Sequence, residues 1–197
     1  MDTSAPLVRG TARPFQPAWV LREVALLCAA SVFLALTARI SVPLPFTPVP
    51  ITGQTLGVIV LGALYGPRRG ALAVAVYLLE GLLGAPVFAA GRAGPAVFLG
   101  PTGGYLVGFI PAAAVAGALA GVSRAWPTRV LGMALASLTV YAVGVPWLMA
   151  VTGAAPLAAL QLGVAPFLVG DAIKVLIAAG VVPAGGLLLE RLGVRPS

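Results

Sequence analysis

The sequence predicts an all-α integral membrane protein, in which six transmembrane helices form a bundle with structured outer loops. Three observations support this class. First, 60% of the 197 residues are hydrophobic. Second, only 9% are charged, against about 25% in a soluble domain, and the mean hydropathy is +1.06. Third, a helical crossing takes about 20 apolar residues, so a chain of this length has room for about six.

Residues 19–191 are expected to form a single transmembrane domain between cytoplasmic tails at 1–18 and 192–197. The N-terminal stretch holds three prolines and two arginines but no apolar core. It therefore lacks the pattern of a signal peptide and is expected to be disordered. The first span is expected at 19–40, where Arg22 and Arg39 near its two ends can reach the lipid headgroups.

Two short apolar stretches follow a proline-rich loop. Residues 42–50 hold four prolines, which favour a stiff extended path over a helix. The stretches at 52–65 and 71–83, joined by a turn at 66–70, each cover only about 20 Å of a hydrocarbon core of about 30 Å. They either cross the membrane with the help of flanking residues or form a re-entrant pair.

A second structured outer loop is expected at 84–100, because glycine, alanine and proline are frequent there. The remaining spans are expected at 102–122, 130–151 and 165–189. Pro166 suits the first turn of the last span, and Pro183 predicts a kink within it.

The placement of arginine predicts that both termini are cytoplasmic. In this orientation only Arg39 and Arg92 face outward. The opposite orientation would place nearly all of the arginines on the outer side, against the positive-inside rule. The arginines on the cytoplasmic side would be Arg9, Arg13, Arg22, Arg68, Arg69, Arg124, Arg129, Arg191 and Arg195. The chain is therefore expected to lie in the cell membrane as a multi-pass protein.

Composition also excludes several function classes. The net charge of +7 comes from scattered arginines without a basic stripe, so nucleic acid is not an expected partner. The absence of histidine excludes Ser-His hydrolysis and His-ligated metals, and the lone Cys28 excludes an internal disulfide. The chain also lacks the G-x-x-x-x-G-K-[ST] phosphate loop of an ATPase. We expect no enzyme activity, no cofactor and no metal.

Glu80, Asp171 and Lys174 are the ionisable side chains well inside apolar stretches, where a charge is unfavourable unless it is paired or functional. Asp171 and Lys174 stand three residues apart, on one helical face near the outer surface. They either form a binding site or merely neutralise each other. Glu80 shares a face with Tyr77, and it either belongs to a site or reaches water at the interface.

Three weaker signals lie outside these charges. Arg92 in the second outer loop can attract an anion, and Gln54 can hydrogen-bond a ligand or cap a helix. Small residues recur at a spacing of four, as at Ala25 and Ala29, and this spacing lets helices pack closely in lipid.

Five motifs stand in order along the chain. They are VPLPFTPVPIT at 42–52 followed by Gln54 and Thr55, YGPRRG at 65–70, PVFA at 86–89, LGPTGGYL at 99–106 and GDAIK at 170–174. Together they resemble the BioY family, the biotin-binding S components of energy-coupling-factor (ECF) transporters. The resemblance implies a six-helix bundle with a biotin pocket near the outer face. It also implies a transmembrane coupling subunit and two cytoplasmic ATPases as partners.

The resemblance assigns biotin contacts to Asp171 and Lys174. Biotin carries a ureido head with two N–H donors and one carbonyl acceptor, so Asp171 can accept from the N–H groups and Lys174 can donate to the carbonyl. We place the tail carboxylate toward Arg92. The other candidate contacts are Gln54, Tyr77, Glu80, Phe46, Phe88 and Tyr105. Family members dock on the coupling subunit through small residues in the first helix, which would be Ala25 and Ala29.

Two other interpretations remain open. A secondary transporter would use Glu80 with the Asp171 and Lys174 pair as a proton relay, and would move biotin or another small solute without ATP. A membrane-embedded assembly subunit would instead pair its buried charges with another chain.

Overall fold

The computed structural model describes residues 17–120, 122 and 125–194. The elements are, in order, α1 (Pro17–Arg39), β1 (Ser41–Leu44), β2 (Thr47–Thr52), α2 (Gln54–Tyr65), α3 (Pro67–Leu82), η1 (Ala89–Gly91), α4 (Pro95–Leu99), α5 (Gly103–Ala120), α6 (Trp126–Thr152), α7 (Pro156–Gly163), η2 (Ala165–Phe167) and α8 (Leu168–Arg191). Most of the predicted tails lies outside the described residues. Residues 17–18, which we assigned to the N-terminal tail, already belong to α1.

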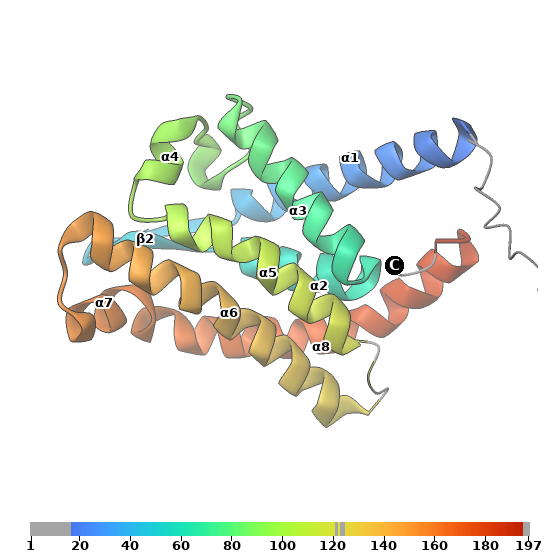
Figure 1. The fold of residues 1–197 in the computed structure, drawn as a ribbon. Coiled ribbons are helices and arrows are strands. Elements are labelled where there is room, and N and C mark those ends of the chain that lie inside the picture. Colours follow the sequence, from blue (N-terminus) through green and yellow to red (C-terminus); the bar gives the residue numbers. More distant parts are fainter. Residues whose placement is uncertain (1–16, 121, 123–124, 195–197) are drawn as a thin grey trace, which may run out of the picture.

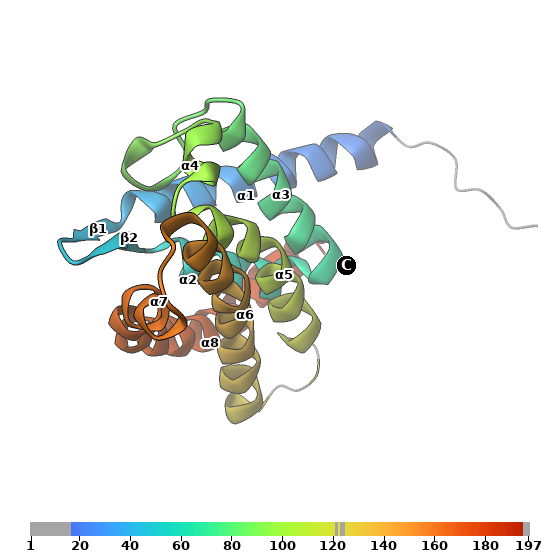
Figure 2. The same cartoon turned by 60° about the vertical axis from the view of Figure 1, so that its left-hand side comes forward.

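The helices α1, α2, α3, α5, α6 and α8 run along the length of the molecule, and consecutive ones run in opposite directions (Figure 1). The β1–β2 hairpin, α4 and α7 lie at one end, here called the loop end (Figures 1 and 2). At the opposite end, the terminal end, α1 begins and α8 finishes. The described chain therefore starts and stops on the same side of the bundle.

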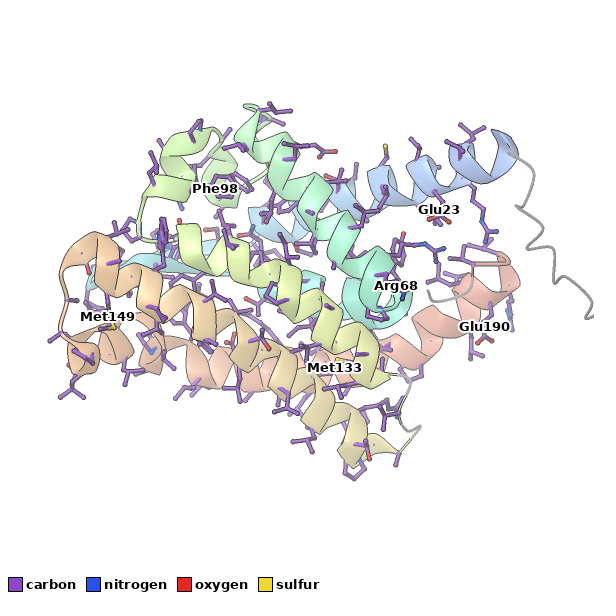
Figure 3. All side chains as sticks on the ribbon, in the orientation of Figure 1. Glu23, Arg68, Phe98, Met133, Met149 and Glu190 are labelled. Carbon is purple, nitrogen blue, oxygen red and sulfur yellow. The ribbon has the colours of Figure 1, made fainter. Side chains whose placement is uncertain are left out.

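Charged side chains tie the helices together at the terminal end, where Figure 3 shows Glu23, Arg68 and Glu190. Arg69 of α3 forms an ion pair with Glu23 of α1, with 2.8 Å between Nε and Oε2. Arg22 donates a hydrogen bond to the carbonyl of Gly193, just beyond α8. The first, third and last long helices are thus joined at this end.

Four described segments are long and apolar enough to cross a membrane. They are Val20–Arg39, Gly103–Ala120, Trp126–Thr152 and Pro156–Arg191. The helices α2 and α3 have only 12 and 16 residues, or about 18 and 24 Å. The structure therefore confirms a mainly helical protein, with four described segments that suit a membrane crossing and two shorter helices.

The position of α2 accounts for its shortness. It packs against α1, α3, α5 and α8, and Val58 and Ile59 at its centre are fully buried. A helix enclosed by other helices makes its backbone hydrogen bonds internally and does not face lipid along its length. It therefore has no need to match the thickness of the hydrocarbon core.

The proline-rich segment at 42–50 is extended, as predicted, and it forms a β-hairpin, which the sequence had not indicated. The strands pair antiparallel, with Ser41 opposite Thr52 and Val42 opposite Ile51. Pro43 lies in β1, Pro45 lies in the turn, and Pro48 and Pro50 stand two apart in β2. Residues two apart in a strand point their N–H positions the same way, so Pro48 and Pro50 can both face away from the partner strand. The remaining residues keep their N–H groups for the hairpin.

Three glycines, here called the glycine crossing, let α2, α3 and α5 approach closely in the terminal half of the bundle. A Cβ at Gly62 of α2 would lie 2.8 Å from the Ala113 carbonyl carbon of α5. A Cβ at Gly70 of α3 would lie 2.8 Å from the Cα of Gly62, and one at Gly117 of α5 would lie 2.5 Å from the Pro67 nitrogen. Only glycine allows this backbone contact between helices.

The bounds of the last two predicted spans differ from those of the helices in the structure. The helix α6 begins at Trp126, four residues before the predicted start, and α7 occupies a stretch between the predicted spans where we expected no helix. The helix α8 continues through Pro183 as one element. Pro166 lies in the short turn η2 that precedes α8.

Candidate functional site

A cavity of about 620 Å³, including its open mouth, lies in the loop-end half of the bundle. Its walls come from the hairpin, the start of α2, the segment between α3 and α5, and residues of α5, α6 and α8. The lining residues are Val49, Pro50, Thr52, Gln54, Thr55, Phe88, Ala89, Arg92, Val97, Thr102, Tyr105, Leu106, Phe109, Val140, Tyr141, Phe167, Asp171 and Lys174.

Asp171 and Lys174 form an ion pair at the α8 wall of this cavity. The Lys174 Nζ lies 2.9 Å from Asp171 Oδ1, and their side chains are only 14% and 11% exposed. The helical spacing of three residues brings both side chains to one face of α8. Burial out of water makes such a pair dependent on good geometry, because each ion loses its hydration.

Two hydroxyl groups of α6 complete the surroundings of the Asp171 carboxylate. Tyr141 donates a hydrogen bond to Oδ2, and Ser137 donates to the same oxygen at 3.4 Å. Ser137 and Tyr141 are four residues apart, so they lie on one face of α6 and together meet α8. The carboxylate therefore has three donors, one on Oδ1 and two on Oδ2.

Gln54 and Arg92 provide polar groups at other parts of the wall. The Gln54 side chain is buried, and its Nε2 donates to the Tyr77 hydroxyl at 2.8 Å. Tyr77 in turn donates to the carbonyl of Val87 at 2.8 Å. Arg92 is exposed and donates from Nε to the carbonyl of Ala89 at 3.4 Å. Its guanidinium places a positive charge at the open side of the cavity.

Aromatic rings supply much of the apolar wall. Phe88 is fully buried and meets the rings of Tyr77 and Phe98 edge to face, at 5.6 and 5.5 Å between centroids. Phe98 belongs to α4 and is labelled in Figure 3. Tyr105 meets Tyr141 edge to face at 6.4 Å and donates its hydroxyl to the carbonyl of Gly163 in α7 at 3.0 Å.

The structure brings six of the nine predicted ligand-contacting residues to the cavity wall. They are Gln54, Phe88, Arg92, Tyr105, Asp171 and Lys174. Phe46 lies at the turn of the hairpin, 60% exposed and away from the cavity. Tyr77 lies behind Gln54, which it positions. Glu80 points to α1 instead, where it accepts a hydrogen bond from Ser31.

The predicted docking residues Ala25 and Ala29 lie on a different surface. Both are exposed on α1, on the face that also presents Val32 and Leu36. This face is free to contact lipid or another membrane protein, and it is separate from the cavity wall.

Sequence reasoning missed the Tyr141 and Ser137 hydroxyls. A tyrosine within an apolar helix is usually a packing residue, so neither residue attracted attention alone. The available signal was their spacing of four within one span, since two polar groups on one face of a membrane helix require partners. The counterpart on α8 is Asp171.

This arrangement suits non-covalent binding of a small amphipathic molecule. Among the described residues, no three His, Cys, Asp or Glu side chains come together as a metal site would require. An apolar cavity with a few convergent polar groups instead holds a ligand in a fixed orientation. The ion pair can meet a neutral polar head, and the arginine can meet an anionic tail.

Comparison with known proteins agrees with this description. The biotin transporter BioY of Rhizobium etli is 40% identical over 159 residues, which are 76% of this chain and 84% of that protein. The biotin transporter BioY of Thermotoga maritima is 42% identical over 160 residues, 78% of this chain and 90% of that protein.

Solved structures share the fold. The crystal structure of the S-component for biotin from an ECF-type ABC transporter matches with a TM-score of 0.79 at 26% identity, over 92% of this chain and 100% of that one. FolT bound with folic acid matches with a TM-score of 0.59 at 18% identity, over 92% of this chain and 98% of that one, which shows a common fold alone. A model of the BioY family matches residues 8–191. Because this match spans nearly the whole sequence, the chain belongs to the BioY family.

Proposed function

We propose that this chain binds biotin in the loop-end cavity and mediates its uptake as the S component of an ECF transporter. The observation that carries the proposal is the buried pair of Asp171 and Lys174 in the wall of an apolar cavity with Arg92 at its open side. Biotin has the matching chemistry, with a neutral polar ureido head, an apolar ring and an anionic tail. The relatives named as biotin transporters support the same ligand.

The chain is a transport protein and not an enzyme, since its family consists of transporters. In our proposal α1, α2, α3, α5, α6 and α8 are six crossings, and both termini are cytoplasmic. The described arginines support this orientation. Arg22, Arg68, Arg69, Arg129 and Arg191 belong to the terminal ends of their helices, while Arg39 and Arg92 belong to the loop end. By the positive-inside rule, this distribution supports a cavity on the outer side.

Equilibrium binding of labelled biotin to the purified chain tests the proposal. We expect saturable binding that unlabelled biotin displaces and that a vitamin without a ureido ring, such as thiamine, does not. An absence of displaceable binding to folded, monodisperse protein would overturn the proposal.

Uptake in cells tests the proposed partners. We propose that a transmembrane coupling subunit docks on α1 at Ala25 and Ala29, and that two cytoplasmic ATPases drive the transport of biotin inward. We propose that the chain itself needs no cofactor. Uptake should therefore stop when the partners are deleted. ATP-independent uptake by the chain alone would support a secondary transporter instead.

The structure gives no support to a proton relay that combines Glu80 with the cavity pair. Glu80 hydrogen-bonds to Ser31 in the seam between α1 and α3, outside the cavity lining. A relay requires its groups to be within hydrogen-bond reach of one another or of bridging water.

Phe46→Ala is expected to leave biotin affinity within about twofold of the original value. The side chain is 60% exposed at the hairpin turn and does not line the cavity. The same binding assay measures the effect. A loss of more than tenfold would show that the hairpin turn folds over the bound ligand.

A further inference from the structure

The hydroxyl group of Tyr77 can donate in only one direction. Tyr77 lies in α3 and is fully buried, and its hydroxyl oxygen lies 2.8 Å from both the Val87 carbonyl oxygen and the Gln54 Nε2. A carbonyl oxygen cannot donate, so the single hydroxyl proton must go to Val87. Toward Gln54, the hydroxyl oxygen can therefore act only as an acceptor.

This direction decides which way the Gln54 amide faces. An amide side chain has a donating NH₂ group on one side and an accepting carbonyl oxygen on the other. The NH₂ group must face Tyr77, because the reversed amide would bring two acceptors together without a proton between them. The carbonyl oxygen, Oε1, therefore faces away from Tyr77.

The Oε1 atom of Gln54 is an acceptor without a partner in the described part of the chain. Gln54 is only 3% exposed, and it lines the cavity. Among the described residues, the side-chain nitrogen or oxygen that is both fully buried and unpartnered is Arg129 Nε, so Gln54 Oε1 retains accessible surface. Because Gln54 lines the cavity, this surface is open to a ligand there.

The shape of a cyclic urea requires acceptors on more than one part of the wall. In a five-membered ring the two N–H groups point away from each other, on opposite sides of the carbonyl, so one acceptor group cannot meet both. Asp171 lies on α8, and its carboxylate already accepts from three protein donors. Gln54 lies on α2, and so it offers its oxygen from a different helix.

We propose that Tyr77 is a positioning residue, which holds the Gln54 amide so that Oε1 accepts a hydrogen bond from one ureido N–H of the ligand. This inference rests on the proposed binding of biotin. Tyr77 lies outside the cavity lining and acts through Gln54. The site then selects a ligand with a donor at this position, because an acceptor there would face Oε1 with no proton between them.

Two analogues of biotin test the donor requirement on the unaltered chain. In each cyclic carbamate analogue, an oxygen atom replaces one of the two ureido N–H groups. The ring keeps its size while it loses one donor. We expect at least one analogue to bind at least about tenfold more weakly than biotin, because its ring oxygen meets Oε1. Equal affinity for biotin and both analogues would overturn the proposal.

Tyr77→Phe tests the positioning role. Phenylalanine keeps the ring that packs against Phe88 but has no hydroxyl oxygen, so the Gln54 amide can turn its NH₂ group toward the cavity. We expect about tenfold weaker binding of biotin, and a loss of discrimination against one analogue, whose ring oxygen can now accept from this NH₂ group. The ratio of the affinities for biotin and the other analogue should stay the same. A purely structural role would weaken all three ligands by the same factor, and that result would overturn the proposal.

Gln54→Met tests whether Tyr77 acts through Gln54. Methionine has a similar length but no amide. We expect this variant to lose discrimination against the same analogue as Tyr77→Phe, because the effects of two changes to one hydrogen bond do not add. Loss of discrimination against the other analogue, or against neither, would overturn the proposal. If Tyr77→Phe does not fold, Gln54→Met with the two analogues still decides which way the amide faces.

Tyr65→Phe is the matched control. Tyr65 is buried at the other end of α2 and donates its hydroxyl to the Leu26 carbonyl at 3.2 Å, outside the cavity lining. Its replacement should leave the affinities for biotin and both analogues unchanged. A change as selective as that of Tyr77→Phe would overturn the assignment. Binding of biotin to the unaltered chain reports on the proposed function separately, so a uniform effect on a chain that binds biotin contradicts only the role of Tyr77.

Discussion

Lys174→Met is expected to lower the affinity for biotin by at least about a hundredfold and to destabilise the folded chain. Methionine has a similar length but no N–H donor, so the ureido carbonyl would lose its partner. Asp171 is 8% exposed and would lose its ion-pair partner, the ammonium 2.9 Å away. Breaking a buried pair by removing one partner typically costs about 3–5 kcal/mol. A binding isotherm and the thermal unfolding midpoint of the purified chain measure the two effects.

The double variant Asp171→Asn with Lys174→Met separates stability from recognition. Neither residue is charged in it, so the unfolding midpoint should recover most of the loss seen with Lys174→Met. The affinity for biotin should remain at least as low as that of Lys174→Met. If the double variant instead binds biotin as the original chain does, the ion pair serves stability alone and the assigned site is wrong.

Gly62→Ala is expected to destabilise the bundle by about 3 kcal/mol or more, the upper end of the range for overpacking. The added Cβ would lie 2.8 Å from the carbonyl carbon of Ala113, and a backbone atom cannot move aside as a flexible side chain can. For a chain of this size the unfolding midpoint should fall by about 6 °C or more. Thermal unfolding in detergent, followed by circular dichroism, measures the change.

Gly186→Ala provides the control in the same class of substitution. Gly186 lies within α8, and no described atom comes within 4 Å of a Cβ built there. Alanine is the better helix former by about 1 kcal/mol, so this variant should be as stable as the original chain or slightly more stable. Equal losses at the two positions would show that the glycine crossing is not a close contact.

The charged part of the site could be predicted from sequence because ionisable residues are rare within the apolar spans of a membrane protein. Asp171 and Lys174 stood out within an apolar span, and their spacing of three placed them on one face. The same rule also selected Glu80, which the structure pairs with Ser31 of α1 instead of placing it in the cavity. The rule identifies residues that need partners, and it does not say where the partners are.

Features that depend on pairing between distant segments were beyond such reasoning. The four prolines at 43–50 suggested a loop, because proline lacks the N–H group that strand pairing uses. Only the register of the hairpin shows that these missing groups need not interrupt the pairing. The site role of Tyr141 depends on Asp171, which is 30 residues away in sequence. The helix α7 is held by carbonyl contacts, in which Leu162 accepts from Thr47 and Gly163 accepts from Tyr105. No local pattern predicts these contacts.

The glycine crossing and the apolar layer beside it close the cavity toward the terminal end of the bundle. Between the cavity and the terminal end, α2, α5, α6 and α8 fill the interior with buried side chains that include Ile59, Met133 and Ala178. Among the described residues this layer closes the cavity toward the terminal end, so a bound molecule is expected to leave by the opening through which it entered. Under the proposed function, inward delivery would then require that the opening itself changes sides of the membrane, carried by a movement of the whole bundle. The rate at which the purified chain releases biotin would then report on this opening alone.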